Sequence, residues 1–126
     1  YNLYEKIKIK DFLMFPGDES KLLKGLEIGC SGCISAIANV THKLAREVFD
    51  DFQKNKTQKS NEKLINVRHT FDKYNLISGL HSYMSLQNPK FKNLLPPLTL
   101  LNSNDQKELL KKLESFKFNL NKNIAA

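Results

Sequence analysis

The stretch FLMFPGDESKLLKGLEIGCSGCISAIANV, residues 12–40, decides the fold of this chain. Its apolar run Phe12–Phe15 predicts a strand that ends at the breaker pair Pro16-Gly17. Leucines then recur at helical spacing after a polar turn, and they predict a helix that ends at Gly29. A second short strand is expected at Cys33-Ile34. The order strand, helix, strand is typical of a parallel sheet covered by helices.

Ligands of such folds bind at the carboxyl ends of the strands. Here those ends are the turns Gly17–Glu19 and Ile34–Ala36, which are therefore the candidate site. A purely structural role is open for the two acids of the first turn. Asp18 and Glu19 can cap and charge the start of the following helix, a contribution of about 0.5–1 kcal/mol.

Size and composition limit the class of protein. A chain of 126 residues with 40% apolar content buries one modest core, so one domain or part of one is expected. No apolar run approaches the roughly 20 residues of a membrane span, and no secretory signal is recognisable, so we expect a cytoplasmic protein without a membrane partner. The first residue is Tyr1 and not Met, which predicts a processed, trimmed or partial sequence.

The formal charge of +7, from 20 basic and 13 acidic residues, raises the possibility of a nucleic-acid partner. Only Arg46 and Arg68 are arginines, and the lysines are spread over every segment. Phosphate clamping and base readout favour clustered Arg, so solvated surfaces are the preferred interpretation. A small basic helical module that binds nucleic acid or an acidic partner is kept as the alternative.

Cys30 and Cys33 have the C-x-x-C spacing of zinc and dithiol sites. Zinc needs two further ligands, and the three histidines of the chain fall on separate predicted helices without paired spacing. A reactive dithiol sits at a helix N-terminus, whereas Cys33 is predicted inside a strand. Two buried, reduced thiols are therefore the favoured interpretation, and no metal site is predicted.

The rest of the chain is predicted to be helical. Residues 1–11 are expected to hold the end of a helix and a loop. Further helices are expected at 41–54, with Thr41 or Asn39 as the N-cap, at 64–74, at 76–86, and after Ser103 as cap, with a proline-marked, anchored loop at 87–101. Two strands cannot shield both faces and both edges of a sheet, so other strands must pair with them.

Several motifs in this order resemble one family. They are Gly17-Asp18-Glu19 after a strand, Gly29-x-x-Gly32-x-Ile34-Ser35, Ala38-Asn39-Val40 before an amphipathic helix, and Leu95-Pro96-Pro97-Leu98 before the last helix. Together they resemble the C-terminal third of the dihydrodipicolinate synthase and N-acetylneuraminate lyase family.

The resemblance implies a C-terminal fragment of a (β/α)8 TIM barrel with a C-terminal helical extension. According to this resemblance, Phe12–Phe15 is strand seven of the barrel and Cys33–Ser35 is strand eight. Residues 1–55 are then the last two β/α units, and residues 56–126 are the extension. The parent is then a class I pyruvate-type aldolase, in which a lysine forms a Schiff base with a 2-oxo acid. That lysine falls upstream of Tyr1, so no catalytic residue is nominated and the fragment is expected to be inactive alone.

The resemblance also implies which residues line the substrate site. Gly17, Asp18 and Glu19 would approach the distal, hydroxyl-bearing part of the substrate, with Gly17 allowing close approach of the backbone. Ile34, Ser35 and Ala36 would line the pocket from strand eight. The implied partners are a small 2-oxo acid and an aldehyde, without a cofactor or nucleic acid, in a homotetrameric parent. Lyase, synthase and dehydratase chemistries all fit this resemblance.

Overall fold

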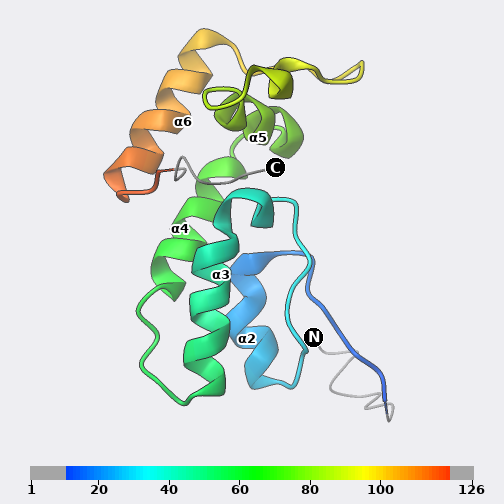
Figure 1. Ribbon diagram of the computed structural model, residues 1–126, viewed down its shortest axis with the longest axis vertical. Coiled ribbons are helices and arrows are strands. Elements are labelled where there is room, and N and C mark those ends of the chain that lie inside the picture. Colours follow the sequence, from blue (N-terminus) through cyan, green and yellow to red (C-terminus); the bar gives the residue numbers. More distant parts are fainter. Residues whose placement is uncertain (1–10, 120–126) are drawn as a thin grey trace. The chain divides into compact units, whose positions relative to one another are not determined.

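The computed structural model describes residues 11–119 (Figure 1). These residues fall into two compact units that are divided between Ile65 and Asn66. The helix end predicted at residues 1–11 lies outside the described residues, apart from Asp11. The domain division predicted at residue 55 concerns the parent barrel and its extension, and it stays a prediction.

The first unit is built on a short helix packed against a long one. The 3-10 turn η1 (Glu19–Lys21) leads into α2 (Leu22–Glu27), which lies beside α3 (Ala38–Gln53) (Figure 1). The helix α4 (Asn61–Phe71) carries the boundary between the two units. The core of the first unit includes a cluster of the buried side chains of Leu22, Leu26, Val48 and Leu64. The predicted helices here are confirmed.

The sequence explains where α2 begins and ends. The Asp18 side chain caps η1, and Gly29 adopts a φ of 95° directly after the last residues of the helix. A left-handed residue at this place is the usual end of a helix, and glycine adopts it without steric cost. The helix end predicted at Gly29 is therefore confirmed.

The predicted N-cap of α3 is wrong. The helix begins at Ala38 after Ile37, and no side chain caps it. Asn39 donates its side-chain amide to the Ala36 carbonyl (2.8 Å). Thr41 lies inside the helix, where its hydroxyl reaches the Ile37 carbonyl (3.0 Å) and the carboxyl group of Glu19 (2.9 Å). The hydroxyl is the donor in both contacts, so it caps none of the N–H groups at the start of α3.

The two predicted strands are not formed in residues 11–119. Their segments nevertheless lie side by side, because Ser31 N donates to Met14 O (2.9 Å) and Ile34 N donates to Pro16 O (3.0 Å). Both bonds advance in the same direction along the chain, as in a parallel pair. Pro16 has no N–H to give the intervening bond, so a regular ladder is interrupted at this point.

The second unit holds α5 (Leu76–Met84), the 3-10 turn η2 (Pro89–Lys92) and α6 (Ser103–Ser115). An aromatic group forms part of its core: the Tyr83 ring meets the Phe71 ring edge-on at 5.8 Å and stacks with the Phe118 ring at 6.1 Å. The predicted helices of this unit are confirmed, with shifts of a few residues at their ends. The cap of α6 is Asn102 and not Ser103, because the Asn102 side chain accepts from the N–H groups of residues 104 and 105.

The connection between α5 and α6 is anchored, as predicted from its prolines. Leu101 N donates to Ser82 Oγ (2.8 Å), and Gln106 Nε2 donates to Ser82 O (3.1 Å). His81 Nδ1 lies 2.7 Å from the Phe91 carbonyl.

Among the described residues, none of the helices is long and apolar enough to cross a membrane.

The core of the first unit gives a first test. Leu64 is fully buried against Leu22 and Leu26, so Leu64→Ala should lower the free energy of unfolding by about 2–5 kcal/mol. Urea denaturation followed by circular dichroism measures this change. Leu13→Ala is the matched control in the same unit, because the Leu13 side chain is 66% exposed. Equal losses of the free energy of unfolding in the two variants would contradict the burial of Leu64 in this core.

Candidate functional site

The first turn of the candidate site is organised by Asp18. Its carboxylate accepts from Ser20 N (2.9 Å) and Ser20 Oγ (2.7 Å), and it lies 4.0 Å from the Lys21 ammonium group. These contacts fix the first residues of η1 and confirm the capping interpretation of Asp18. A role in substrate binding stays a prediction.

Glu19 points in the opposite direction, into the protein. Its side chain is fully buried, and it accepts hydrogen bonds from Thr41 Oγ1 (2.9 Å) and from Ser35 Oγ. The carboxyl group thus joins the first turn, the second turn and the first residues of α3. A buried carboxyl group needs such donors, because burial without them costs several kcal/mol.

A hollow of about 430 Å³ opens at the first turn and is lined by Met14, Pro16, Gly17, Asp18 and Lys21. Gly17 and Asp18 are the two predicted site residues among these. A Cβ atom placed on Gly17 would lie 3.9 Å from Ile34 O, an ordinary contact, so close approach of the chain itself does not demand glycine there. Lys21 was missed by the sequence analysis, although its i, i+3 spacing from Asp18 is visible in the sequence.

The second turn lies directly against the first. Ile34 N bonds to Pro16 O, and Ser35 bonds to Glu19, so the two predicted strand ends are brought together. Ser35 is half-buried, Ala36 is exposed, and the Ile34 side chain is 71% exposed. The structure thus gathers the predicted site residues in one region, with Glu19 beneath the surface.

Cys30 and Cys33 are free thiols. Burial raises the pKa of Cys30. Burial also raises the pKa of Cys33, and the charges of Glu19 and Asp18 raise it further. These directions oppose thiolate chemistry at neutral pH. Within residues 11–119, no three Cys, His, Asp or Glu side chains are grouped as metal ligands.

Comparison with known proteins places the chain. Residues 2–116 match the model of the dihydrodipicolinate synthetase family. The chain belongs to this family. The chain is also similar to a 4-hydroxy-tetrahydrodipicolinate synthase of Desulforamulus reducens, with 36% identity over 52 residues. These residues are 41% of this chain and 18% of the synthase.

The solved structures of this family share the fold. Dihydrodipicolinate synthase DapA-2 of Bacillus anthracis matches with a TM-score of 0.75 and 20% identity, over 85% of this chain and 38% of the enzyme. Proteus mirabilis N-acetylneuraminate lyase matches with a TM-score of 0.69 and 19% identity, over 82% of this chain and 37% of the lyase. The chain therefore has the fold of the corresponding part of these TIM-barrel proteins, and spans little more than a third of their length.

The hydrogen bond between Thr41 and Glu19 can be tested without changing side-chain shape. Thr41→Val removes the hydroxyl and leaves one lone pair of the buried carboxyl group unsatisfied, so the free energy of unfolding should fall by about 1–3 kcal/mol. Urea denaturation measures the loss. Thr70→Val is the matched control, because the buried Thr70 hydroxyl donates only to Asn66 O of its own helix (2.8 Å). A loss no larger than in the control would argue against the carboxyl contact.

The raised thiol pKa values predict slow alkylation. The rate for Cys33 with iodoacetamide should rise at a higher pH in the folded chain than in the urea-unfolded chain, because less thiolate is present at each pH. Glu19→Gln should shift the Cys33 profile toward lower pH, since one negative charge is lost. The Cys30 profile serves as the internal control. Identical folded and unfolded profiles would refute the prediction.

Proposed function

We propose that this chain forms strands seven and eight, their helices and the C-terminal extension of a class I aldolase-type lyase or synthase. The parent enzyme would act on pyruvate or a related 2-oxo acid through a Schiff base. Membership in the dihydrodipicolinate synthetase family and the fold likeness over 85% of the chain support this proposal. The fragment is inactive alone in this proposal, because the resemblance places the Schiff-base lysine upstream of Tyr1.

The junction of the two turns is the observation that carries the proposal. Residues that follow the two strand segments meet through the Ile34–Pro16 backbone bond and the Ser35–Glu19 bond. The carboxyl ends of neighbouring strands form the substrate face of a TIM barrel. Their direct contact supports the proposal that the two turns, residues 17–19 and 34–36, form one side of a single active site, which we call the substrate wall.

The chemistry assigns different tasks to this wall and to the lysine. A Schiff-base lysine must be neutral to attack a carbonyl, and the protonated imine then accepts electrons during carbon–carbon cleavage or formation. In this proposal, Gly17 and Asp18 approach the distal part of the substrate, and Ile34, Ser35 and Ala36 line the pocket from strand eight. Glu19 is a positioning residue, because its buried carboxyl group reaches the site through Ser35.

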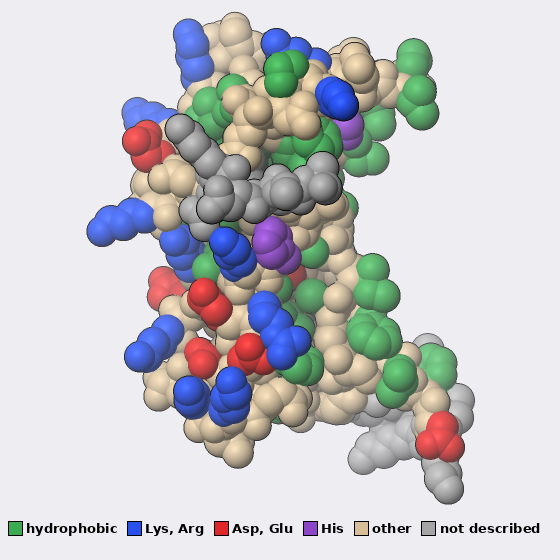
Figure 2. Space-filling view, viewed as in Figure 1, with side chains coloured by type: hydrophobic (Ala, Val, Ile, Leu, Met, Phe, Trp, Pro, Cys, Tyr) green, Lys and Arg blue, Asp and Glu red, His purple; other side chains and the backbone are tan. Residues whose placement is uncertain are grey.

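The surface charge supports the enzyme proposal over the nucleic-acid alternative. Figure 2 shows Lys and Arg side chains at separate places from the top of the view to its lower left, with acidic side chains among them. A nucleic-acid site is expected to gather its basic residues on one surface.

The parent is further proposed to be cytoplasmic and homotetrameric.

Schiff-base formation is tested in a chain that includes the six preceding β/α units. Borohydride reduction with pyruvate should add the mass of one reduced pyruvyl group to a single lysine, which peptide mass spectrometry should place before Tyr1. The 126-residue chain alone should give no adduct. An unmodified longer chain would exclude the proposed chemistry.

The role of the wall is tested by Ser35→Ala in the same longer chain. The variant should raise the KM for the aldehyde substrate by about tenfold, because one hydrogen bond of about 1.4 kcal/mol is lost, and should leave pyruvate adduct formation intact. Ser31→Ala is the matched control, since Ser31 precedes the strand end. Equal kinetics in the two variants would remove Ser35 from the site.

A further inference from the structure

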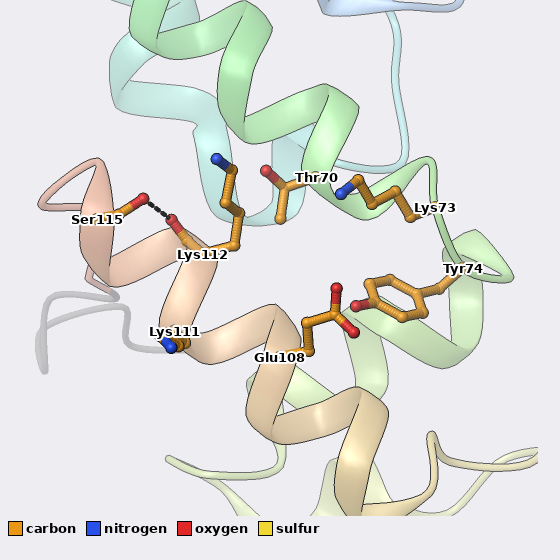
Figure 3. Close-up of a pocket in the computed structure, with 7 residues that line it drawn as sticks. All are labelled: Thr70, Lys73, Tyr74, Glu108, Lys111, Lys112 and Ser115. Atoms are coloured by element: carbon orange, nitrogen blue, oxygen red, sulfur yellow. Dashed lines mark hydrogen bonds between the residues drawn. The ribbon is translucent and has the colours of Figure 1, made fainter.

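The second unit contains a separate hollow of about 240 Å³ between the end of α4 and α6 (Figure 3). It is lined by Thr70, Lys73, Tyr74, Glu108, Lys111, Lys112 and Ser115. Its volume is below that of pockets for drug-sized ligands, so it suits a small compound. The proposed aldolase chemistry uses none of these residues.

Positive charge dominates this hollow, because its lining holds three lysines and one carboxylate, that of Glu108. Within residues 11–119, none of the three lysines forms an ion pair with a carboxylate. Lys112 Nζ lies 4.9 Å from the centre of the Phe116 ring, which holds that side chain against α6. An anion in the hollow would therefore meet ammonium groups that form no ion pair with a carboxylate of the described residues.

An ordinary structural role for Lys73 would be to satisfy the last carbonyl groups of α4. Backbone groups satisfy two of these carbonyl groups: Asp72 N donates to Arg68 O (3.1 Å), and Tyr74 N donates to Phe71 O (3.1 Å). Within residues 11–119, no hydrogen bond joins the Lys73 ammonium group to the end of this helix.

The two ends of the hollow differ in chemistry. Figure 3 shows Lys73 and Lys112 extending toward the side where Thr70 lies, while the Tyr74 hydroxyl and the Glu108 carboxylate face one another. Burial first, and then the charges of Glu108 and Asp105, raise the pKa of Tyr74, so its phenol stays protonated at neutral pH. One end therefore offers cations, and the other offers one hydrogen-bond donor and one acceptor.

We propose that this hollow binds a small phosphorylated polyol, with the phosphate on Lys73 and Lys112 and the hydroxyl groups on Tyr74 and Glu108. Lysine binds phosphate as a point charge, and two ammonium groups match its two negative charges. A carboxylate accepts hydrogen bonds from hydroxyl groups but repels a second anion, so Glu108 favours a ligand with only one anionic end.

Calorimetric titration of the full chain at constant ionic strength tests the proposal with three probes. Glycerol 3-phosphate should bind more tightly than inorganic phosphate, and glycerol alone should give no measurable heat of binding. This comparison also separates a phosphate ester from free phosphate as the ligand. Equal or weaker binding of the ester, or no binding of either phosphate compound, would overturn the proposal.

Variants then assign the contacts. Lys73→Gln and Lys112→Gln should each raise the Kd for glycerol 3-phosphate about tenfold, whereas Lys107→Gln, an exposed lysine of α6 outside the hollow, should change it less than about twofold. Similar losses in all three would indicate general charge attraction and refute the site. Glu108→Gln should tighten inorganic phosphate and reduce the preference for the ester. An unchanged preference would refute the proposed orientation.

Discussion

The buried Glu19 carboxyl group is the constraint on which the first unit depends. It accepts from Thr41 in α3 and from Ser35 in the second turn, while the preceding residue caps the helix that leads to the core. Removing a carboxyl group from water is costly unless donors replace the lost hydration. Only a conformation that keeps both hydroxyl groups in place meets this condition. One side chain therefore fixes the spacing of three segments that lie 16 and 22 residues apart.

The neighbouring acidic residues Asp18 and Glu19 have different structural roles. Asp18 is half-buried at the hollow and holds the first turn, whereas Glu19 is buried and holds the second turn against the first. The alternation follows from geometry, because successive side chains in an extended or turn conformation point in different directions. In the proposed active site, Asp18 then lies at the surface of the hollow, and Glu19 acts through Ser35.

The sequence predicted the helices well, because their apolar stripes and end signals are local. Leu22 and Leu26 on one helix and Val48 on the next have the spacing of a buried face, and Gly29 marks a helix end. The cap of α3 was mispredicted because Thr41 bonds to a residue far away in the sequence. The inward direction of Glu19 could not be predicted for the same reason, since its donors have no periodic relation to it.

The missing strands have a different physical origin. The segments at residues 12–16 and 31–36 lie in parallel order, yet Pro16 lacks one donor, and Leu13 and Ile34 are exposed. A pair of strands is marginal without further strands or a covered face, so the same residues form a regular sheet only when neighbours pair with them. Strand tendency is thus local, whereas the ladder is a property of the surrounding sheet. Because Glu19 and the Ile34–Pro16 bond already join the two ends, the proposed substrate wall does not require a complete ladder to hold its shape.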